Sequence, residues 1–290
     1  MRQLLLLFSL LLLAAACKRE QQQLDTFAAG TGAESAARHL ETPRSPRGMT
    51  EQIIEHMGYT TSYNADRRQP NWVCYELTPE EARGRQERQG EFQPDPQAKG
   101  RSASNADYSR SGYGRGHMAP AGDMKWNSKA MRESFYLSNI CPQRGALNAG
   151  LWNDLEMGIR SMARGGTTVY IACGPIFTGS KPRTIGSGRV AVPDSFFKVL
   201  LRNTGKGYEA IGYIFPNANC KGSVNDYACT VDDVERQTGI DFFPALPDDI
   251  EYAVEARSDT GQWRWRTASS ENHFQQRGRR RQDREYTFRR

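Results

Sequence analysis

The stretch from residue 148 to residue 175 restricts the possible folds more than any other part of the sequence. Residues 148–164 have a helical composition and end at Gly165 and Gly166, where a helix is expected to stop. Residues 167–173 follow as an apolar run of strand length, which Gly174 and Pro175 end. The apolar residues of the first segment recur at helical spacing: Leu151, Trp152, Leu155 and Ile159. We therefore predict an amphipathic helix that leads directly into a buried strand.

Other segments extend this pattern of strands with a few helices. Residues 71–77, 190–192, 196–201 and 208–215 are strand-like, and the last two are joined by a glycine-containing turn at 205–207. Residues 232–238 resemble a short helix that ends at Gly239. Residues 78–111 are polar and long for a loop, which is typical of a functional or poorly ordered segment. The order predicts one α+β domain over residues 49–256, with a helix-bearing insertion after His117.

The N-terminus has the features of an export signal. Residues 4–13 form an apolar run after Arg2, and residues 14–16 are alanines that suit a cleavage site. This run is too short to span a bilayer comfortably. Cys17 follows directly, as in a bacterial lipoprotein, whose acylated cysteine holds the mature chain on a membrane. We predict a signal peptide at residues 1–16 and lipidation of Cys17 in a periplasm-facing or surface protein. An ordinary secretory signal with an incidental cysteine is the alternative.

Positive charge is concentrated at the other end of the chain. The formal net charge of the 290 residues is +6, but residues 277–290 hold seven Arg against Asp283 and Glu285, a net of +5. The rest of the chain therefore sums to only +1. We expect a flexible spacer at residues 17–48 and an Arg-rich, disordered tail at 257–290. The tail is either a solvated segment or a region that attracts nucleic acid or anionic lipid.

Five cysteines remain after Cys17, so an exported chain has an odd number available for disulfides. Cys220 and Cys229 flank a polar loop and are the best candidate pair. Cys74 and Cys173 lie in strand-like runs and would pair only if those strands are neighbours. No CxxC spacing occurs, which argues against a zinc site built on cysteines.

Three residue types in the middle of the chain suit the hydrolysis of a phosphodiester. A base must deprotonate water, and a histidine such as His117 is suited to that task. A hard divalent cation must neutralise charge on the phosphate, and it prefers oxygen ligands such as the amide of Asn148. Arg115 offers a fixed charge and forked donors to phosphate oxygens. On a helix, Glu156 and Arg160 would share one face with Asn148, because they follow it by eight and twelve positions.

These residues belong to three blocks that resemble one known family. The blocks are residues 113–123 with the Arg-Gly-His sequence, residues 138–143 with Ser-Asn-Ile-Cys-Pro-Gln, and residues 147–156 with Leu-Asn, Trp and Leu-Glu at fixed positions. In this order and spacing they are similar to the DNA/RNA non-specific endonuclease family of the ββα-metal type. The resemblance covers residues 49–255 and implies a central antiparallel sheet with a metal-binding helix in a single domain. Gly114 is a departure, because the family pattern has Asp before Arg-Gly-His.

The resemblance implies a role for each matching residue. His117 corresponds to the general base, Asn148 to the direct ligand of Mg²⁺, and Glu156 to a residue that holds the metal through water. Arg115 and Arg160 correspond to phosphate-contacting arginines, and Asn139 to an amide that orients the catalytic groups. Mg²⁺, with Mn²⁺ able to substitute, DNA and RNA substrates, and a homodimer are the implied partners. The expected function is an exported Mg²⁺-dependent nuclease that cuts DNA and RNA, and a non-catalytic nucleic-acid-binding lipoprotein is the alternative.

Structural roles compete with these assignments. A lone histidine is more often a hydrogen-bonded structural residue than a catalyst. Asn148 has the residue type of an N-cap, and this role is compatible with metal binding. Glu156 and Arg160 have the spacing of a surface ion pair. Asp123 is expected to be structural.

Overall fold

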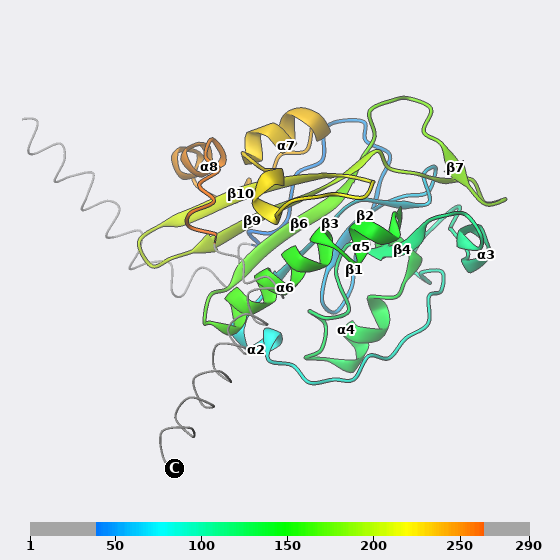
Figure 1. Cartoon of the computed structure of the whole chain (residues 1–290), viewed down its shortest axis with the longest axis horizontal. Coiled ribbons are helices and arrows are strands. Elements are labelled where there is room, and N and C mark those ends of the chain that lie inside the picture. The colour runs from blue at the N-terminus through cyan, green and yellow to red at the C-terminus, as the bar shows by residue number, and fades with distance from the viewer. Residues whose placement is uncertain (1–38, 264–290) are drawn as a thin grey trace, which may run out of the picture.

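A seven-stranded sheet crosses the centre of the protein in the computed structural model, which describes residues 39–263 (Figure 1). Its strand order is β1-β2-β3-β6-β9-β10-β11, and every neighbouring pair is antiparallel. The strands are β1 Gln52–Glu55, β2 Thr60–Asn64, β3 Gln69–Leu77, β6 Val169–Ile176, β9 Ser195–Asn203, β10 Tyr208–Pro216 and β11 Ala228–Cys229. The prediction of an α+β domain with a central antiparallel sheet is confirmed.

The longest pairing joins β9 and β10 through a glycine turn. Tyr208 pairs with Asn203 at the turn, and Pro216 pairs with Ser195 at the far end. Gly205 and Gly207 have φ values of 77° and 137°, which glycine adopts without steric cost. The turn predicted at residues 205–207 and both strands beside it are therefore confirmed.

The two faces of the sheet are buried under different layers. Side chains alternate between the faces, so Val73 packs in one cluster with Cys173, while Cys74 packs in the other cluster with Ala172. Helix α6, Leu151–Arg164, covers the first face through Trp152. Helices α7, Val231–Thr238, and α8, Asp248–Glu255, lie over the second face (Figure 1). The helix expected at 232–238 is confirmed, and it ends at Gly239 with a φ of 72°.

The chain between β3 and α6 forms a separate layer that carries the second sheet. Strands β4, Gly114–His117, and β5, Ile140–Gln143, pair antiparallel there. The helices of this layer are α2 Pro79–Ala82, α3 Asn105–Tyr108, α4 Ser128–Glu133, η2 Leu137–Asn139 and α5 Gly145–Asn148. The remaining elements are β7 Thr184–Ile185, β8 Val190–Ala191 and η3 Val224–Tyr227. The helix-bearing insertion expected after His117 is present as α4, η2 and α5.

The helix predicted over residues 148–164 is divided in two. Asn148 is the last residue of α5, and α6 begins only at Leu151 after a cap at Gly150. Asn148 is therefore not the N-cap of the long helix. A side chain at Gly150 would place its Cβ 2.5 Å from the carbonyl oxygen of Ala146. The chain thus turns sharply at a glycine between the two helices.

Both expected boundaries of the domain need correction. Leu40 is buried, the side chain of Arg44 pairs with Asp241, and the indole of Trp72 donates a hydrogen bond to Ser45. The expected spacer therefore ends before residue 39, because the residues from Leu40 onward are packed on the body. Trp263 is also buried, so the expected tail does not begin at residue 257.

The remaining terminal predictions lie outside the described residues. These are the signal peptide at residues 1–16, the lipidation of Cys17 and the Arg-rich segment at residues 277–290. Within residues 39–263, no helix combines the length and the apolarity that a membrane crossing requires.

The cysteines of residues 39–263 are all free thiols. The predicted Cys220–Cys229 disulfide is absent, since the Cys220 thiol donates instead to the carbonyl oxygen of Pro216. Cys74 and Cys173 do lie on neighbouring strands, but Cys173 is opposite Val73. Their side chains consequently enter different faces of the sheet, and this alternative pair is absent as well.

Candidate active site

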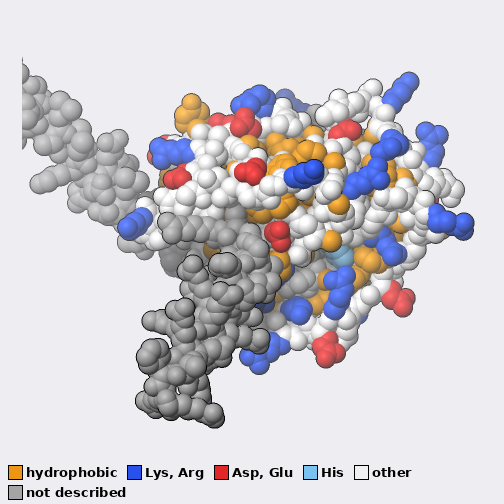
Figure 2. Space-filling view, in the orientation of Figure 1, with side chains coloured by type: hydrophobic (Ala, Val, Ile, Leu, Met, Phe, Trp, Pro, Cys, Tyr) orange, Lys and Arg blue, Asp and Glu red, His pale blue; other side chains and the backbone are white. Residues whose placement is uncertain are grey.

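Most of the residues singled out from the sequence line one pocket of about 510 Å³. His117 and Arg115 come from β4, Asn148 from α5, and Glu156 and Arg160 from α6. The other lining residues are Arg88, Phe92, Pro120, Ala121, Gly122 and Asn153. Figure 2 shows Lys and Arg side chains gathered on the side of the molecule where β4, α3 and β7 lie. The pocket therefore combines one histidine, oxygen donors and several guanidinium groups.

The β4–β5 pair places His117 at the edge of the pocket. His117 is opposite Ile140 and Gly116 is opposite Cys141, so the Arg-Gly-His sequence is in strand register with Ser-Asn-Ile-Cys-Pro-Gln. Gly116 faces the side chain of Gln143, and a Cβ there would lie 2.7 Å from the Gln143 Cβ. The glycine between Arg115 and His117 is thus needed for the close approach of the two strands.

The imidazole of His117 lies in an aromatic and cationic environment. Its ring packs against Phe92 at 5.3 Å and edge-on against Phe135 at 5.1 Å between centroids. Its Nε2 is buried and has no hydrogen-bond partner among the described residues. Burial lowers the pKa of His117 to about 3, and the positive charges of Arg88 and Arg115 act in the same direction. The histidine is therefore neutral at neutral pH.

Asn139 lies behind the pocket and holds the chain that follows His117. Its buried side-chain oxygen accepts a hydrogen bond from the backbone of Ala119 at 2.8 Å. Its amide donates to the carbonyl oxygens of Ala119 and Ser134. These bonds leave Asn139 out of the pocket lining, in a position to orient the segment that carries His117.

Asn148 and Glu156 approach the pocket from the two helices on either side of Gly150. Although the helix is interrupted, both side chains reach the same space, as the expected spacing implied. Burial raises the pKa of Glu156 to about 7, while the charge of Lys198 acts to lower it. The ammonium of Lys198 is 4.0 Å from Glu156 Oε1 and 4.4 Å from the centre of the Trp152 ring. Lys198 is completely buried, and its Nζ makes no hydrogen bond within the described residues.

Arg160 is held by Asp123 rather than by Glu156. Its guanidinium forms an ion pair with Asp123, which also accepts a hydrogen bond from the hydroxyl of Tyr75 at 2.9 Å. A Cβ at Gly122 would lie 2.7 Å from the guanidinium, so the glycine leaves space for it. Asp123 is structural, as predicted, and the reading of Glu156 and Arg160 as a surface ion pair is wrong.

Two pocket residues from the long polar segment escaped the sequence analysis. The guanidinium of Arg115 lies 4.4 Å from the centre of the Phe92 ring, and that of Arg88 lies 4.9 Å from the Phe135 ring. The aromatic pair that encloses His117 therefore also supports two cations. Neither Arg88 nor Phe92 belongs to a recognisable motif. Lys198 was missed too, although a single lysine inside the apolar run 196–201 is a signal that could have revealed it.

The donors in the pocket fit a hard divalent cation. Asn148, Asn153 and Glu156 present amide and carboxylate oxygens, and no thiol lines the pocket. Mg²⁺ prefers such ligands and keeps several waters when few protein groups bind it. The set of residues is thus compatible with the metal expected from the sequence.

Comparison with known proteins agrees with this arrangement. The chain is 38% identical over 218 residues to the mitochondrial nuclease EXOG of Danio rerio, covering 69% of this chain and 64% of the relative. It is 36% identical over 212 residues to the mitochondrial endonuclease G of Homo sapiens, covering 67% of this chain and 70% of the relative. The chain spans less than two thirds of the EXOG proteins of Danio rerio and Xenopus laevis, at 64% and 59% of their lengths.

A solved structure and a family model extend the likeness to the fold. The crystal structure of EndoG in the EndoG/EndoGI complex superposes with a TM-score of 0.65 at 29% identity, covering 76% of this chain and 96% of that chain. The fold is therefore that of a ββα-metal nuclease, with β4, β5 and α6 as its two strands and helix. The model of the DNA/RNA non-specific endonucleases matches residues 37–249, which include every residue of the pocket. With its three sequence blocks assembled around one pocket, the chain belongs to the DNA/RNA non-specific endonuclease family.

Proposed function

We propose that this protein is an exported, Mg²⁺-dependent endonuclease that hydrolyses the phosphodiester bonds of both DNA and RNA. The observation that carries the proposal is that one pocket contains a neutral His117, the oxygens of Asn148 and Glu156, and the guanidinium groups of Arg88 and Arg115. The names of the relatives, a nuclease EXOG and an endonuclease G, support the same reaction class.

His117 acts as the general base. Its pKa lies below the ordinary value, so the imidazole is neutral at neutral pH and has a lone pair that can accept a proton from water. The rings of Phe92 and Phe135 restrict the imidazole to one orientation. Asn139 contributes by holding the backbone just after His117.

Three arginines contribute to binding of the substrate phosphate. One guanidinium nitrogen of Arg115 donates a hydrogen bond to Asn105 Oδ1 at 2.7 Å, and its other N–H groups can bind phosphate. Arg88 stacks on Phe135 and lines the pocket, while Arg160 is already paired with Asp123. We assign phosphate binding mainly to Arg115 and Arg88, and a weaker electrostatic contribution to Arg160. Contacts of this kind do not read bases, which suits an enzyme without sequence preference.

Asn148 is the direct ligand of the cation in this proposal, and Glu156 holds it through water. When bound, Mg²⁺ neutralises negative charge on the phosphate and the leaving oxygen. The charge of Lys198 acts to lower the pKa of Glu156, which favours the ionised form that attracts the cation.

Substitution of His117 tests the nuclease activity. The mature protein and its His117→Ala variant are incubated with plasmid DNA and with RNA, with and without Mg²⁺ or Mn²⁺. We expect the wild type to cut both polymers only with metal, and the variant to lose about 10²–10⁴-fold in rate. Equal, negligible cleavage by both proteins would favour the non-catalytic alternative, for which Gly114 is the argument.

Substitution of Asn148 tests the metal assignment. Asn148→Ala is expected to abolish the cleavage that depends on Mg²⁺. Asn153→Ala serves as the comparison, because the Asn153 amide lines the same pocket. Cleavage by Asn148→Ala with an unchanged Mg²⁺ requirement would show that another residue is the direct ligand.

Export and anchoring by Cys17 form the second part of the proposal. The apolar run, the alanines and the position of Cys17 support it. Cells that express the wild type or Cys17→Ala are grown with radiolabelled palmitate. We expect label only in the wild type, and equal labelling of both would contradict lipidation at this residue.

A further inference from the structure

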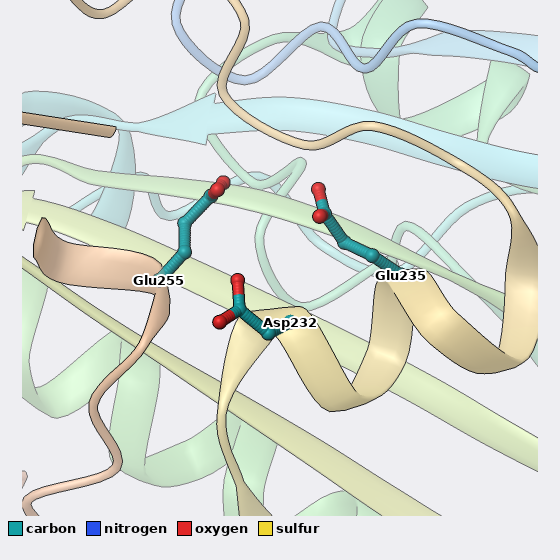
Figure 3. Close-up of side chains that lie close together, drawn as sticks. All are labelled: Asp232, Glu235 and Glu255. Atoms are coloured by element: carbon teal, nitrogen blue, oxygen red, sulfur yellow. The ribbon is translucent and has the colours of Figure 1, made fainter. Parts of the chain in front are cut away.

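Three carboxylates meet on the face of the sheet opposite the pocket. Asp232 and Glu235 belong to α7, and Glu255 is the last residue of α8. One oxygen from each lies within 4.8 Å of the others. Figure 3 shows the three side chains pointing toward a common space between the two helices. The pocket residue Glu156 lies on α6, which packs against the other face.

The carboxylate of Glu255 is buried and uncompensated. Glu255 is only 5% exposed, and its Oε1 has no hydrogen-bond partner among residues 39–263. Burial, together with the charges of Glu235 and Glu251, raises the pKa of Glu255 to about 9. A buried carboxylate ordinarily has a cation or donors beside it, because the loss of water is otherwise costly.

Two arginines near the cluster are paired with other carboxylates. Arg236 pairs with Asp233 at 2.6 Å, and Arg44 pairs with Asp241 at 2.9 Å. Glu235 receives one backbone hydrogen bond from Phe242 and no ion pair within residues 39–263. The cluster therefore has an excess of negative charge that no described side chain of the protein neutralises.

The geometry points to a binding site for Ca²⁺ formed by Asp232, Glu235 and Glu255. Two oxygens that bind one Ca²⁺ at about 2.3–2.6 Å can be at most about 5 Å apart, which the observed spacing satisfies. The donors are all carboxylates, and Ca²⁺ tolerates irregular sites completed by water. An exported protein meets Ca²⁺ at concentrations that suit a weak site, with a Kd of about 10⁻⁴–10⁻³ M.

Bound Ca²⁺ would fasten α8 to α7. Helix α8 buries only Glu255 completely and contributes Ile250 and Val254 as partly buried apolar contacts. Docking buries the Glu255 carboxyl beside the carboxylates of α7, and this placement disfavours its ionised form. A divalent cation binds the ionised form and offsets that cost, so the site stabilises the C-terminal part of the fold and does not depend on catalysis.

The first test measures Ca²⁺ binding and thermal unfolding of the full mature chain. After treatment with a chelator, we expect equilibrium dialysis to give one radioactive Ca²⁺ per Asn148→Ala chain, whose pocket lacks its direct ligand, and a rise in its Tm of about 2–5 °C at several millimolar Ca²⁺. NaCl at equal ionic strength should give a smaller rise. An equal rise with NaCl would identify charge screening and overturn the proposal, as would the absence of binding.

Variants locate the site. Glu255→Gln, made in the Asn148→Ala chain, is expected to melt above its parent in chelator, because no buried acid has to be protonated on folding. It is expected to lose both the bound Ca²⁺ and the Ca²⁺-dependent rise in Tm. Asp249→Asn is the matched control, since Asp249 is exposed on the same helix and should leave Ca²⁺ binding intact. Asn148→Ala should also retain binding. Retention by Glu255→Gln, or loss with Asn148→Ala, would contradict the proposed location.

Discussion

At the scale of single residues, burial shifts the pKa values of His117 and Glu156 in opposite directions and favours the neutral form of each. His117 is kept neutral, whereas Glu156 is close to half-ionised at neutral pH, because burial raises its pKa to about 7. The ionised form of Glu156 is present above that pKa and is lost as the pH falls through it. The acid side of the pH profile should therefore report Glu156, since His117 titrates only near pH 3.

This assignment predicts how Mg²⁺ changes the pH dependence of cleavage. A cation and a proton compete for the same negative site, so we expect the acid limb of kcat/KM to move to lower pH as Mg²⁺ increases. The measurement is the rate of plasmid cleavage from about pH 5 to 9 at low and high Mg²⁺. A limb that stays near pH 6.5, the ordinary value for histidine, at every Mg²⁺ concentration would instead identify His117 as the titrating group.

Lys198 has a positioning role that can be separated from catalysis. Its ammonium is 4.0 Å from Glu156 Oε1, so Lys198→Met should raise the pKa of Glu156, move the acid limb to higher pH and weaken the apparent affinity for Mg²⁺. Lys206→Met is the control, because Lys206 is exposed in the β9–β10 turn. A purely structural role of Lys198 would lower stability without moving the pH profile.

At the scale of elements, the β4–β5 pair depends on one glycine of the Arg-Gly-His sequence. A Cβ at Gly116 would be 2.7 Å from the Gln143 Cβ, whereas a Cβ at Gly114 would be 3.6 Å from the nearest atom, the Gln143 carbonyl oxygen. Gly116→Ala should therefore cost about 1–3 kcal/mol and reduce cleavage, because the strands must separate. Gly114→Ala should change the free energy of unfolding little. Urea unfolding compares the two variants, and equal effects would show that the close packing at Gly116 is not needed.

At the scale of the whole molecule, charge is divided between the folded body and the C-terminal end. Residues 277–290 carry +5 of the total +6, so we expect them to contribute to the capture of nucleic acid. Deleting these residues from a His117→Ala chain should weaken DNA binding and reduce the slope of log K against log salt. An unchanged slope in fluorescence anisotropy would show that the tail makes no phosphate contacts.

The sequence alone determined much of this protein because its strongest signals are local. The strand periodicity of residues 167–173, the turn at 205–207 and the helix before Gly239 each depend on neighbours in the chain, and all three are present. The three blocks that carry Arg115, His117, Asn148 and Glu156 also sufficed to identify the family. Their residues converge because β4, β5, α5 and α6 are consecutive elements of one motif.

Only the tertiary structure decided which side chains share an environment. Arg88 and Phe92 reach the pocket from a segment without periodicity, and Lys198 approaches Glu156 from β9, 42 positions along the chain. The alternative pairing of Cys74 with Cys173 failed for the same reason, since strand register places these two residues on opposite faces. Arg115-Gly-His117 could thus be recognised in the sequence, but the pKa of its histidine depends on burial and on charges brought together by folding.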